Sequence, residues 1–453
     1  MKKEKKEIDL LHGPIWPKVL AFSLPLAATG ILQQLFNAAD IAVLGQFVGK
    51  HAMGAVGSVS PVVGLLVNLF VGLSIGANVI ISNFTGQHND CKVSQATHTA
   101  VVLSAIAGII LLFLGELIAV PMVHILDTPD ELAPMAVKYL RIYFIGMPFI
   151  AMYNFESAIF RSQGNTRTPL ICLAISGSLN VALNLFFVIV VGMDVDGVAT
   201  ATVISNVVSS SLLFVLLSRS KEAIRLERGH FRINRVILSN IVRIGLPSGL
   251  QGMVFSLSNL VIQSAINSLG ADVVSGSAAA FNIEIFGYYI LNSFGQAAVT
   301  FIGQNFGAGD LERCRNVTKQ VLILDEIATV IVAVVLILSA HQLLAIFNSD
   351  PAVIHYGYIR VFTLLSTEVL NVVIEVLSGS MRGYGFSMVP AMVALFGICG
   401  TRIVWVYTIF RQIHTFDNLM AVYPVSWALT MTVMIFAYFH VRKKVQEMHP
   451  EMR

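Results

Sequence analysis

The chain has 453 residues, of which 56% are hydrophobic and 12% are charged, and its formal net charge is +3. The apolar residues form long, repeated runs, and this composition excludes an ordinary soluble enzyme. The sequence therefore indicates an all-α polytopic membrane protein.

Twelve segments are long and apolar enough to cross a membrane, which takes about 20 residues per helix. They are expected near residues 17–45, 58–83, 95–120, 132–160, 169–190, 197–218, 240–268, 278–303, 319–345, 355–381, 388–410 and 421–441. Residues 1–10 are rich in Lys and Glu and have no apolar core, so we expect no signal peptide. The four cysteines form neither a disulfide framework nor a zinc motif.

The positive residues predict the orientation in the membrane. If the amino terminus is inside, the loops on the cytoplasmic side hold 23 of the 29 Lys and Arg residues. Cytoplasmic loops are enriched in these residues, so the asymmetry favours an even number of helices with both termini in the cytoplasm. We expect a monomer in the cytoplasmic (inner) cell membrane, in contact with membrane lipid and without a nucleic-acid partner.

The two halves of the sequence resemble each other on either side of the most basic loop. Leu24-Pro25 matches Leu246-Pro247 at an offset of 222, and corresponding helices run in the same direction. The halves should therefore be related by a pseudo-two-fold axis along the membrane normal. The predicted organisation is a six-helix amino-terminal lobe over 1–218, a basic cytoplasmic linker over 219–239 and a six-helix carboxy-terminal lobe over 240–453.

One carboxylate lies inside the first predicted helix. Asp40 is the only charge between Val19 and Gly49, and a carboxylate at the centre of a membrane helix costs ~2.5–3.5 kcal/mol on insertion scales. Such a residue usually faces protein or water and marks an ion or substrate path. Gln33 and Asn37 fall on the same helical face as Asp40.

Further polar residues recur at helical spacing. The predicted segment 240–268 carries a stripe that includes Asn259 and Gln263 but no acid. The amides of this segment and of the first segment, 17–45, either line a substrate cavity or join helices by hydrogen bonds worth about 1 kcal/mol. The predicted segments 169–190 and 197–218 add Asn180, Asn184 and Thr202. Oxygen ligands of this kind suit a hard cation such as Na⁺, and a carboxylate supplies the charge that selects it.

The second half has acids of its own. Glu284 lies in the outer third of the predicted segment 278–303, and Arg402 should lie at comparable depth in the segment 388–410. The two could therefore form an ion pair that serves either transport or packing. Glu156 is expected to be an inner-rim acid paired with a cytoplasmic basic group. Asp325 is expected to be an interfacial charge.

Together these features resemble the multidrug and toxic compound extrusion (MATE) transporters over nearly the whole chain. The motifs that carry the resemblance are Ser23-Leu24-Pro25, Asn37-x-x-Asp40, the loop 161–169, the stretch 303–310 and Met381-Arg382-Gly383. The resemblance implies outward transport of drugs or metabolites, driven by inward movement of Na⁺ or H⁺. No nucleotide-binding or hydrolase motif appears, so we expect no enzyme activity and no cofactor other than the coupling ion.

The resemblance also implies a cation site in the amino-terminal lobe, made of Asp40, Asn180, Asn184 and Thr202. The family often has Asp at the position of Asn184. One carboxylate is a weaker Na⁺ site than two, whereas a single Asp suffices for a proton. Na⁺ and H⁺ both remain open, with the balance toward H⁺.

A related branch of the family has a cation site in the carboxy-terminal lobe, whose acids align with Phe255 and Asn371. Neither position is acidic in this chain. Glu368 lies one turn from Asn371 and could substitute for the missing acid.

The expected mechanism combines Asp40 with Pro25. Ion binding at Asp40 should let helix 1 kink at Pro25, collapse the amino-terminal cavity and displace the substrate outward. Expected substrates are amphipathic compounds, cationic ones among them, attracted by Met and aromatic side chains. The alternatives are a lipid-linked oligosaccharide flippase of the same superfamily, which would need several Arg or Lys residues for pyrophosphate, and a non-transporting membrane scaffold.

Overall fold

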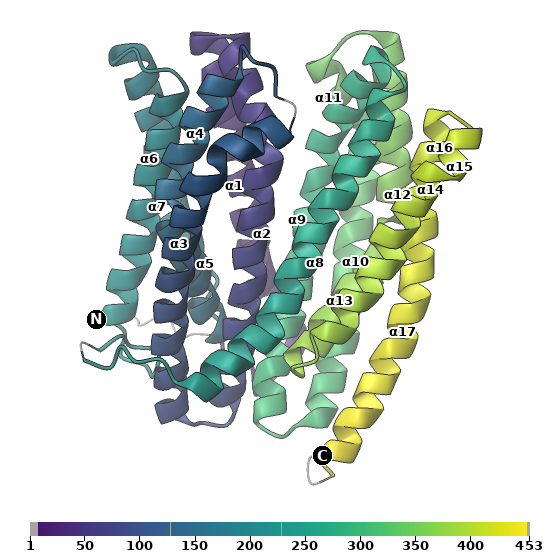
Figure 1. Cartoon of the computed structure of the whole chain (residues 1–453). Helices are drawn as coiled ribbons and strands as arrows, with labels where there is room; N and C mark the ends of the chain where they lie inside the picture. The colour runs from purple at the N-terminus through teal and green to yellow at the C-terminus, as the bar shows by residue number, and fades with distance from the viewer. Residues whose placement is uncertain (1–7, 127, 228, 451–453) are drawn as a thin grey trace. The chain divides into compact units, whose positions relative to one another are not determined.

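The computed structural model describes residues 8–126, 128–227 and 229–450, and these residues form α-helices with a few π-helical turns, η1 to η3 (Figure 1). The first half contains α1 (Ile15–Val43), η1 (Leu44–Val48), α2 (Lys50–Gly86), α3 (Asp90–Ile125), α4 (Ala133–Ile145), α5 (Met147–Ser162), α6 (Arg167–Leu185), η2 (Phe186–Val190) and α7 (Val195–Ser218). The second half contains α8 (Arg235–Asn267), α9 (Ala271–Gly307), α10 (Leu311–Leu338), α11 (Ala340–Phe347), α12 (Pro351–Gly383), α13 (Met388–Ala394), η3 (Leu395–Gly400), α14 (Thr401–Tyr407), α15 (Ile409–Gln412), α16 (Phe416–Met420) and α17 (Val422–Met448).

Within the described ranges, 11 helices are long and apolar enough to cross a membrane, or 12 if one bent pair counts as a single span. That pair is α4 and α5, which meet at an angle of 49° next to Gly146 and Pro148. Each predicted segment overlaps one of these spans, so the all-α membrane fold is confirmed. The segment predicted over 319–345 divides instead into α10 and the short helix α11.

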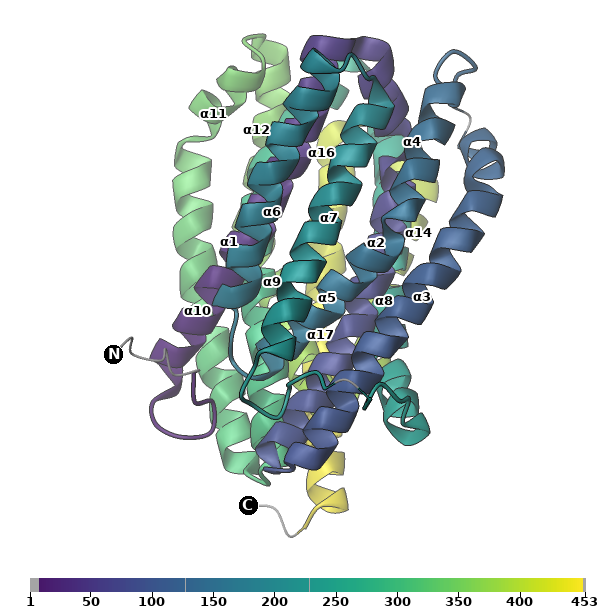
Figure 2. The ribbon, with the colours of Figure 1, turned by 90° about the vertical axis from the view of Figure 1, so that its left-hand side faces the viewer.

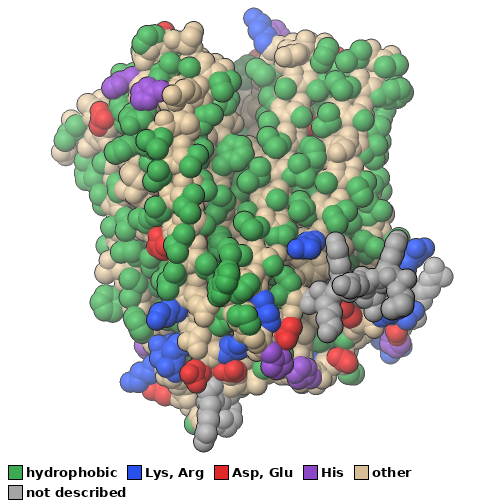
Figure 3. All heavy atoms as spheres, turned by 180° about the vertical axis from the view of Figure 1, so that it is seen from behind, with side chains coloured by type: hydrophobic (Ala, Val, Ile, Leu, Met, Phe, Trp, Pro, Cys, Tyr) green, Lys and Arg blue, Asp and Glu red, His purple; other side chains and the backbone are tan. Residues whose placement is uncertain are grey.

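Hydrophobic side chains dominate the molecular surface. On the face shown in Figure 3 they cover a broad middle band, and most Lys and Arg side chains gather toward one edge. Many large apolar residues are exposed, among them Leu117 at 76% and Phe113 at 64%. Contiguous apolar surface of this kind is stable against lipid rather than water.

Contacts divide the chain into two compact units. The first comprises chiefly Ala28–Gly249, and the second comprises Asp9–Ala27 with Leu250–Arg453. Helix α1 therefore begins in the second unit and ends in the first, and α8 does the reverse. The lobe boundaries inferred from the sequence stay a prediction.

Both helices that pass between units contain a proline just before the crossing. Pro25 precedes the boundary at Ala27 in α1, and Pro247 precedes the boundary at Gly249 in α8. Proline has no backbone N–H to give to the preceding turn, so a helix bends more easily there. α1 is nevertheless one continuous helix through Pro25, and bending at this residue stays a prediction.

The first unit is built around α5, which packs against α2, α3 and α7, while α6 runs beside α7 (Figure 2). Glycines allow α2 and α8 to touch closely. A Cβ atom on Gly72 would lie 2.1 Å from the backbone nitrogen of Gly249, and one on Gly76 would lie 2.2 Å from the backbone oxygen of Ile241. Such small-residue pairs are typical of closely packed membrane helices.

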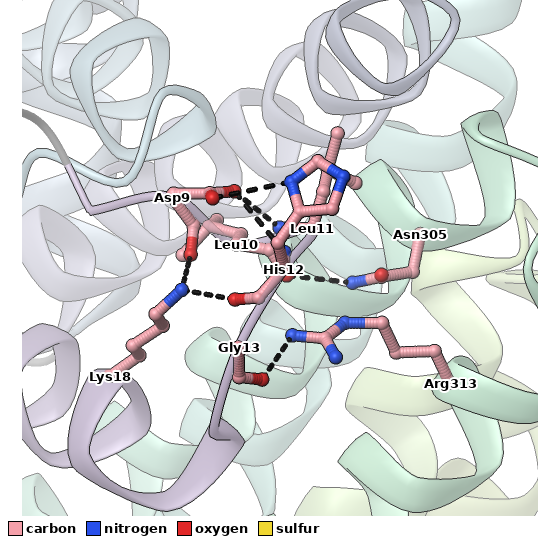
Figure 4. A network of polar contacts seen from close by, with 8 residues as sticks. All are labelled: Asp9, Leu10, Leu11, His12, Gly13, Lys18, Asn305 and Arg313. Atoms are coloured by element: carbon pink, nitrogen blue, oxygen red, sulfur yellow. Dashed lines mark hydrogen bonds and ion pairs between the residues drawn. The ribbon is translucent and has the colours of Figure 1, made fainter.

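In the second unit, α12 packs against α9, α10 and α17. The segment before α1 is tied to the same unit (Figure 4). Asn305 donates to the Leu10 carbonyl at 3.2 Å and Arg313 donates to the Gly13 carbonyl at 3.0 Å, and Leu10 is buried. Partial burial tends to raise the pKa of Asp9. Hydrogen bonds from the N–H groups of Leu11 and His12 outweigh this effect and lower the pKa.

The segment before α8 is anchored to α3 in the first unit. The backbone N–H of Glu227 donates to His98 Nε2 at 3.0 Å, and the Asn234 amide donates to Gln95 Oε1 at 3.0 Å. Ile224 and Leu226 are buried in the same core as α3. The predicted basic linker is thus packed against helices of the first unit over much of its described length.

The glycine contact between α2 and α8 makes a stability prediction. Gly72→Ala should lower the free energy of unfolding by ~1–3 kcal/mol, the usual cost of overpacking, because the added methyl group meets backbone atoms. Gly64→Ala, on the same helix, has open space at its Cβ and should leave stability unchanged or raise it. Thermal unfolding in detergent compares the two variants. Equal midpoints would contradict the close contact.

Candidate functional site

Asp40 lies near the end of α1 and is held by polar side chains of α6 and α7. Asn184 Nδ2 donates to Asp40 Oδ1 at 2.5 Å, and the Thr202 hydroxyl donates to Oδ2 at 3.3 Å. Asn180 completes the group, since its Oδ1 accepts from Asn184 at 3.3 Å and its Nδ2 donates to Thr202 at 3.4 Å. The structure therefore places the four residues in one hydrogen-bonded group, and their role as a cation site stays a prediction.

The group contains a negative charge without a positive partner. No described Lys or Arg lies within ion-pair distance of Asp40, and Asn180 and Asn184 are buried at 4% and 0% exposure. The Oδ1 atom of Asn184 is buried without a hydrogen-bond partner. A free carbonyl oxygen thus lies on the side chain that contacts the carboxylate, and it is a ready ligand for a cation.

Local backbone features position these side chains. The Phe36 ring packs directly on Gly177 of α6, where a Cβ atom would come within 1.8 Å of the ring. This contact lies one turn before Asp40 on α1 and just before Asn180 on α6. Both helices then continue as π-helical turns, η1 and η2, which contact each other. Such turns are rare and occur frequently at functional sites.

Two tyrosines near Asp40 were not predicted as site residues. Tyr139 and Tyr143 of α4 are buried, their rings stack with centroids 5.9 Å apart, and both lie within electrostatic range of the Asp40 carboxylate. Their spacing of four residues puts them on one helical face, but nothing in the sequence indicates that this face meets α1.

In the second unit, Glu284 pairs with Arg360 and not with Arg402. Arg360 donates from Nε to Glu284 Oε2 at 3.0 Å and from Nη2 to Oε1 at 2.5 Å, and Nη1 donates to the Ser277 hydroxyl at 2.5 Å. The predicted pair of Glu284 with Arg402 is therefore wrong. The prediction failed because depth in the membrane does not determine which helix faces which, and α12 carries Arg360 directly against α9.

Arg402 has neutral partners instead. Its Nη1 donates to Asn259 Oδ1 at 3.2 Å, and its guanidinium lies 4.3 Å from the centre of the Tyr423 ring. The side chain is buried at 4% exposure. Like Asp40 in the first unit, it is a charge in the interior of a membrane protein without a described counterion.

The remaining predicted site residues do not form a single group. Gln33 and Asn37 are exposed on α1. Gln263 donates to its own helix neighbour Asn267 at 2.9 Å. Glu368 is buried at 6% exposure and accepts from Asn371 at 3.2 Å, and its transport role stays a prediction.

Two further acids are more deeply buried than predicted. Glu156 is fully buried, and neither carboxylate oxygen has a hydrogen-bond partner, although the Ser210 hydroxyl lies close by. Asp325 is also fully buried and has only Thr329, at 3.3 Å, as a hydrogen-bond partner. Pairing of Glu156 with a basic group and an interfacial position for Asp325 are therefore wrong. Hydropathy places both acids near a helix end but does not show how tightly neighbouring helices cover them.

The sequence pattern of the MatE family matches residues 25–186 and 247–408, one stretch in each half of the chain. The chain belongs to the MATE family. The two matches contain both crossing prolines, Asp40 and Arg402, so the repeat inferred from the sequence coincides with two copies of the family pattern. The family consists of transporters, so this chain is a transporter and not an enzyme.

Individual MATE relatives cover nearly the whole chain. The chain is 23% identical over 444 residues to the probable multidrug resistance protein YoeA of Bacillus subtilis, which covers 95% of each chain. It is 27% identical over 392 residues to the probable multidrug resistance protein NorM of Thermotoga maritima, covering 85% of this chain and 84% of the relative. A solved MATE structure in complex with MaL6 superposes with a TM-score of 0.90 at 21% identity, over 98% of this chain and 99% of the other.

The buried ion pair between Glu284 of α9 and Arg360 of α12 makes a prediction about stability. Glu284→Gln should destabilise the protein by about 3–5 kcal/mol, because it leaves the buried Arg360 without its counterion. Asp196→Asn breaks the pair with Lys138, whose side chain is 55% exposed, and should cost at most about 1 kcal/mol. Denaturation in detergent measures both variants. A Glu284→Gln variant as stable as Asp196→Asn would contradict the assignment.

Proposed function

We propose that this MATE protein exports amphipathic small molecules, cationic ones among them, in exchange for H⁺ or Na⁺. The observation that carries the proposal is the Asp40 group: one carboxylate in a membrane-spanning helix, surrounded by amides and a hydroxyl, without a basic partner. A structural role does not require an uncompensated charge, whereas exchange of an ion does.

The chemistry of the group supports reversible cation binding. A proton neutralises Asp40 directly, and the protonated oxygen can donate a hydrogen bond to an amide carbonyl. A sodium ion would instead be held by Asp40, Thr202 and the carbonyl oxygens of Asn180 and Asn184. For Na⁺, Asn184 would have to turn its amide, so that the Oδ1 atom that now has no partner faces the ion. For H⁺, a proton on Asp40 Oδ2 can be donated to the Thr202 hydroxyl while Asn184 keeps its bond to Oδ1.

The proposal favours a proton over Na⁺. The group contains one carboxylate, and its other oxygen ligands are neutral. A single carboxylate is sufficient to bind one proton. It attracts a sodium ion less strongly than two carboxylates would. We therefore expect the proton gradient to be the stronger driving force.

Neutralisation of Asp40 would act through α1. The helix passes from one unit to the other just after Pro25, four turns before Asp40. A change in the hydrogen bonds of Asp40 would shift the end of α1 relative to α6 and α7, and Pro25 offers a place for the helix to bend. Pro247 gives α8 a hinge at the equivalent place. The proposed export cycle is thus alternating access with hinges in two repeat-related helices.

The proposal places the protein in the inner membrane with both termini in the cytoplasm, as the distribution of Lys and Arg favours. Relatives named as multidrug resistance proteins and as the multidrug export protein MepA of Staphylococcus support a drug-like substrate.

A flippase for lipid-linked sugars is not favoured. Glu284 already neutralises Arg360, so few buried cations are left to bind a pyrophosphate.

Replacement of Asp40 tests the coupling. Asp40→Asn keeps the size of the side chain but cannot be ionised, so efflux of a fluorescent dye driven by a pH or Na⁺ gradient should fall to background. Efflux is measured in inside-out vesicles with the two gradients imposed independently. Glu116→Gln is the matched control, because this acid is partly exposed beside Arg141 and its loss should not alter efflux. Gradient-driven efflux in Asp40→Asn would rule out the proposed site.

A second variant tests the choice of ion. Asn184→Asp adds the carboxylate that other family members carry and should make dye efflux depend more strongly on Na⁺ at constant pH. The measurement is the rate of efflux against Na⁺ concentration for wild type and variant. An unchanged Na⁺ response would show that Asn184 does not act as a ligand of the coupling ion.

A further inference from the structure

Arg402 presents an unused hydrogen-bonding edge in the interior of the second unit. Nη1 donates to Asn259 and the guanidinium stacks on Tyr423, but the described residues offer no acceptor to Nε or Nη2. Nε and Nη2 form the side of the guanidinium that binds a carboxylate or phosphate with two parallel hydrogen bonds. The free edge therefore has the geometry of an anion site.

The nearby acids Glu284 and Glu368 attract Arg402 through space, but neither forms a hydrogen bond or an ion pair with it. Glu284 receives two hydrogen bonds from Arg360, and Glu368 accepts from Asn371. No described carboxylate is within ion-pair distance of Arg402. A buried guanidinium is costly unless it is paired and hydrogen-bonded. The described residues supply no acceptor for the Nε edge itself, and an anionic group would complete it.

Arg402 lies next to an exposed polar stripe on α8. Asn259, the hydrogen-bond partner of Arg402, is exposed on α8 together with Gln263 and Asn267. A ligand that contacts this stripe could extend an acidic group toward the Nε edge while Asn259 keeps its bond to Nη1. The sequence analysis leaves this stripe open between a substrate cavity and hydrogen bonds between helices, and Arg402 contacts it through Asn259.

The repeat relation adds an independent argument. At the offset that relates the two halves, Tyr423 corresponds to Thr202 and Thr401 corresponds to Asn180. Thr202 and Asn180 belong to the group around Asp40, whereas Tyr423 stacks on Arg402, the neighbour of Thr401. The second half thus holds a guanidinium beside the positions that surround a carboxylate in the first half, although Arg402 itself corresponds to Val181 and Asp40 to Ile262.

We propose that Arg402 binds an acidic group of the exported compound, so that the substrates of this protein include amphipathic acids and zwitterions. The inference rests on the proposed export function and defines its substrate class. Arg402 selects compounds with a carboxylate, sulfonate or phosphate through the Nε and Nη2 edge, while Asp40 binds the coupling cation in the other unit.

A matched pair of dyes tests the proposal. Rhodamine 110 carries a free carboxylate and rhodamine 123 is its methyl ester, so the two differ in the group that Arg402 should recognise. Binding is measured by fluorescence polarisation with the full-length protein in phosphatidylcholine nanodiscs. Wild type should bind rhodamine 110 more tightly than rhodamine 123. Arg402→Gln should weaken rhodamine 110 binding about tenfold or more, the loss expected for charge-assisted hydrogen bonds, and leave rhodamine 123 within about twofold.

Two further variants and nanodiscs that contain phosphatidylglycerol serve as controls. Arg402→Lys should keep part of the preference, and Arg411→Gln, which removes an exposed arginine of the same unit, should not alter it. The proposal is overturned if both dyes weaken equally in Arg402→Gln, if neither changes, or if wild type has no preference. Loss of the wild-type preference when phosphatidylglycerol is added would assign the site to a lipid headgroup and also overturn it. Binding is measured without an ion gradient, so failure of coupled export would appear separately in the vesicle assay.

Discussion

The central constraint in this structure is the unpaired carboxylate of Asp40. Water would solvate it freely, but in a membrane-spanning helix it depends on the amide of Asn184 and the hydroxyl of Thr202. Those residues come from α6 and α7, so the charge holds three helices in one arrangement. Close packing of Phe36 on Gly177 and the adjoining π-helical turns keep the partners in place. A cation that neutralises the charge would remove the reason for this arrangement, which is why the group suits a coupling site.

The two halves share a scaffold but differ in charge. Both have a first helix with a proline at the unit boundary, and both anchor the segment before that helix by hydrogen bonds. In the first half this shared framework surrounds a carboxylate. In the second it surrounds a guanidinium on an aromatic ring, while the nearby acid Glu284 is fully used by Arg360. In the proposed function, the first half would bind the coupling ion and the second half would bind an ionic group of the substrate.

Hydropathy was sufficient to predict the membrane helices, because each must provide an apolar run of nearly fixed length. The grouping of Asp40, Asn180, Asn184 and Thr202 was predicted from the family resemblance, which supplied the helices that meet. Helical spacing alone shows only which of these residues share a face of one helix. The partner of Glu284 could not be predicted, because Arg360 and Arg402 lie at similar depths and only helix packing distinguishes them. The burial of Glu156 and the proximity of Tyr139 to Asp40 also depend on how each helix is rotated about its own axis, which hydropathy does not show. The break between α4 and α5 has a local signal, Gly146 followed by Pro148, but such a pair does not determine the angle.

The most direct test of this account is to observe the protonation of Asp40 itself. Infrared difference spectra of the protein in lipid, recorded between acidic and alkaline buffer, report the C=O stretch of protonated carboxyl groups. The account predicts a band that disappears at alkaline pH in wild type and in Glu116→Gln, and that is absent in Asp40→Asn. Glu156, Asp325 and Glu368 are also buried acids, so the band of Asp40 is the part of the wild-type spectrum that Glu116→Gln keeps and Asp40→Asn loses. Identical difference spectra for wild type and Asp40→Asn would contradict Asp40 as the coupling site.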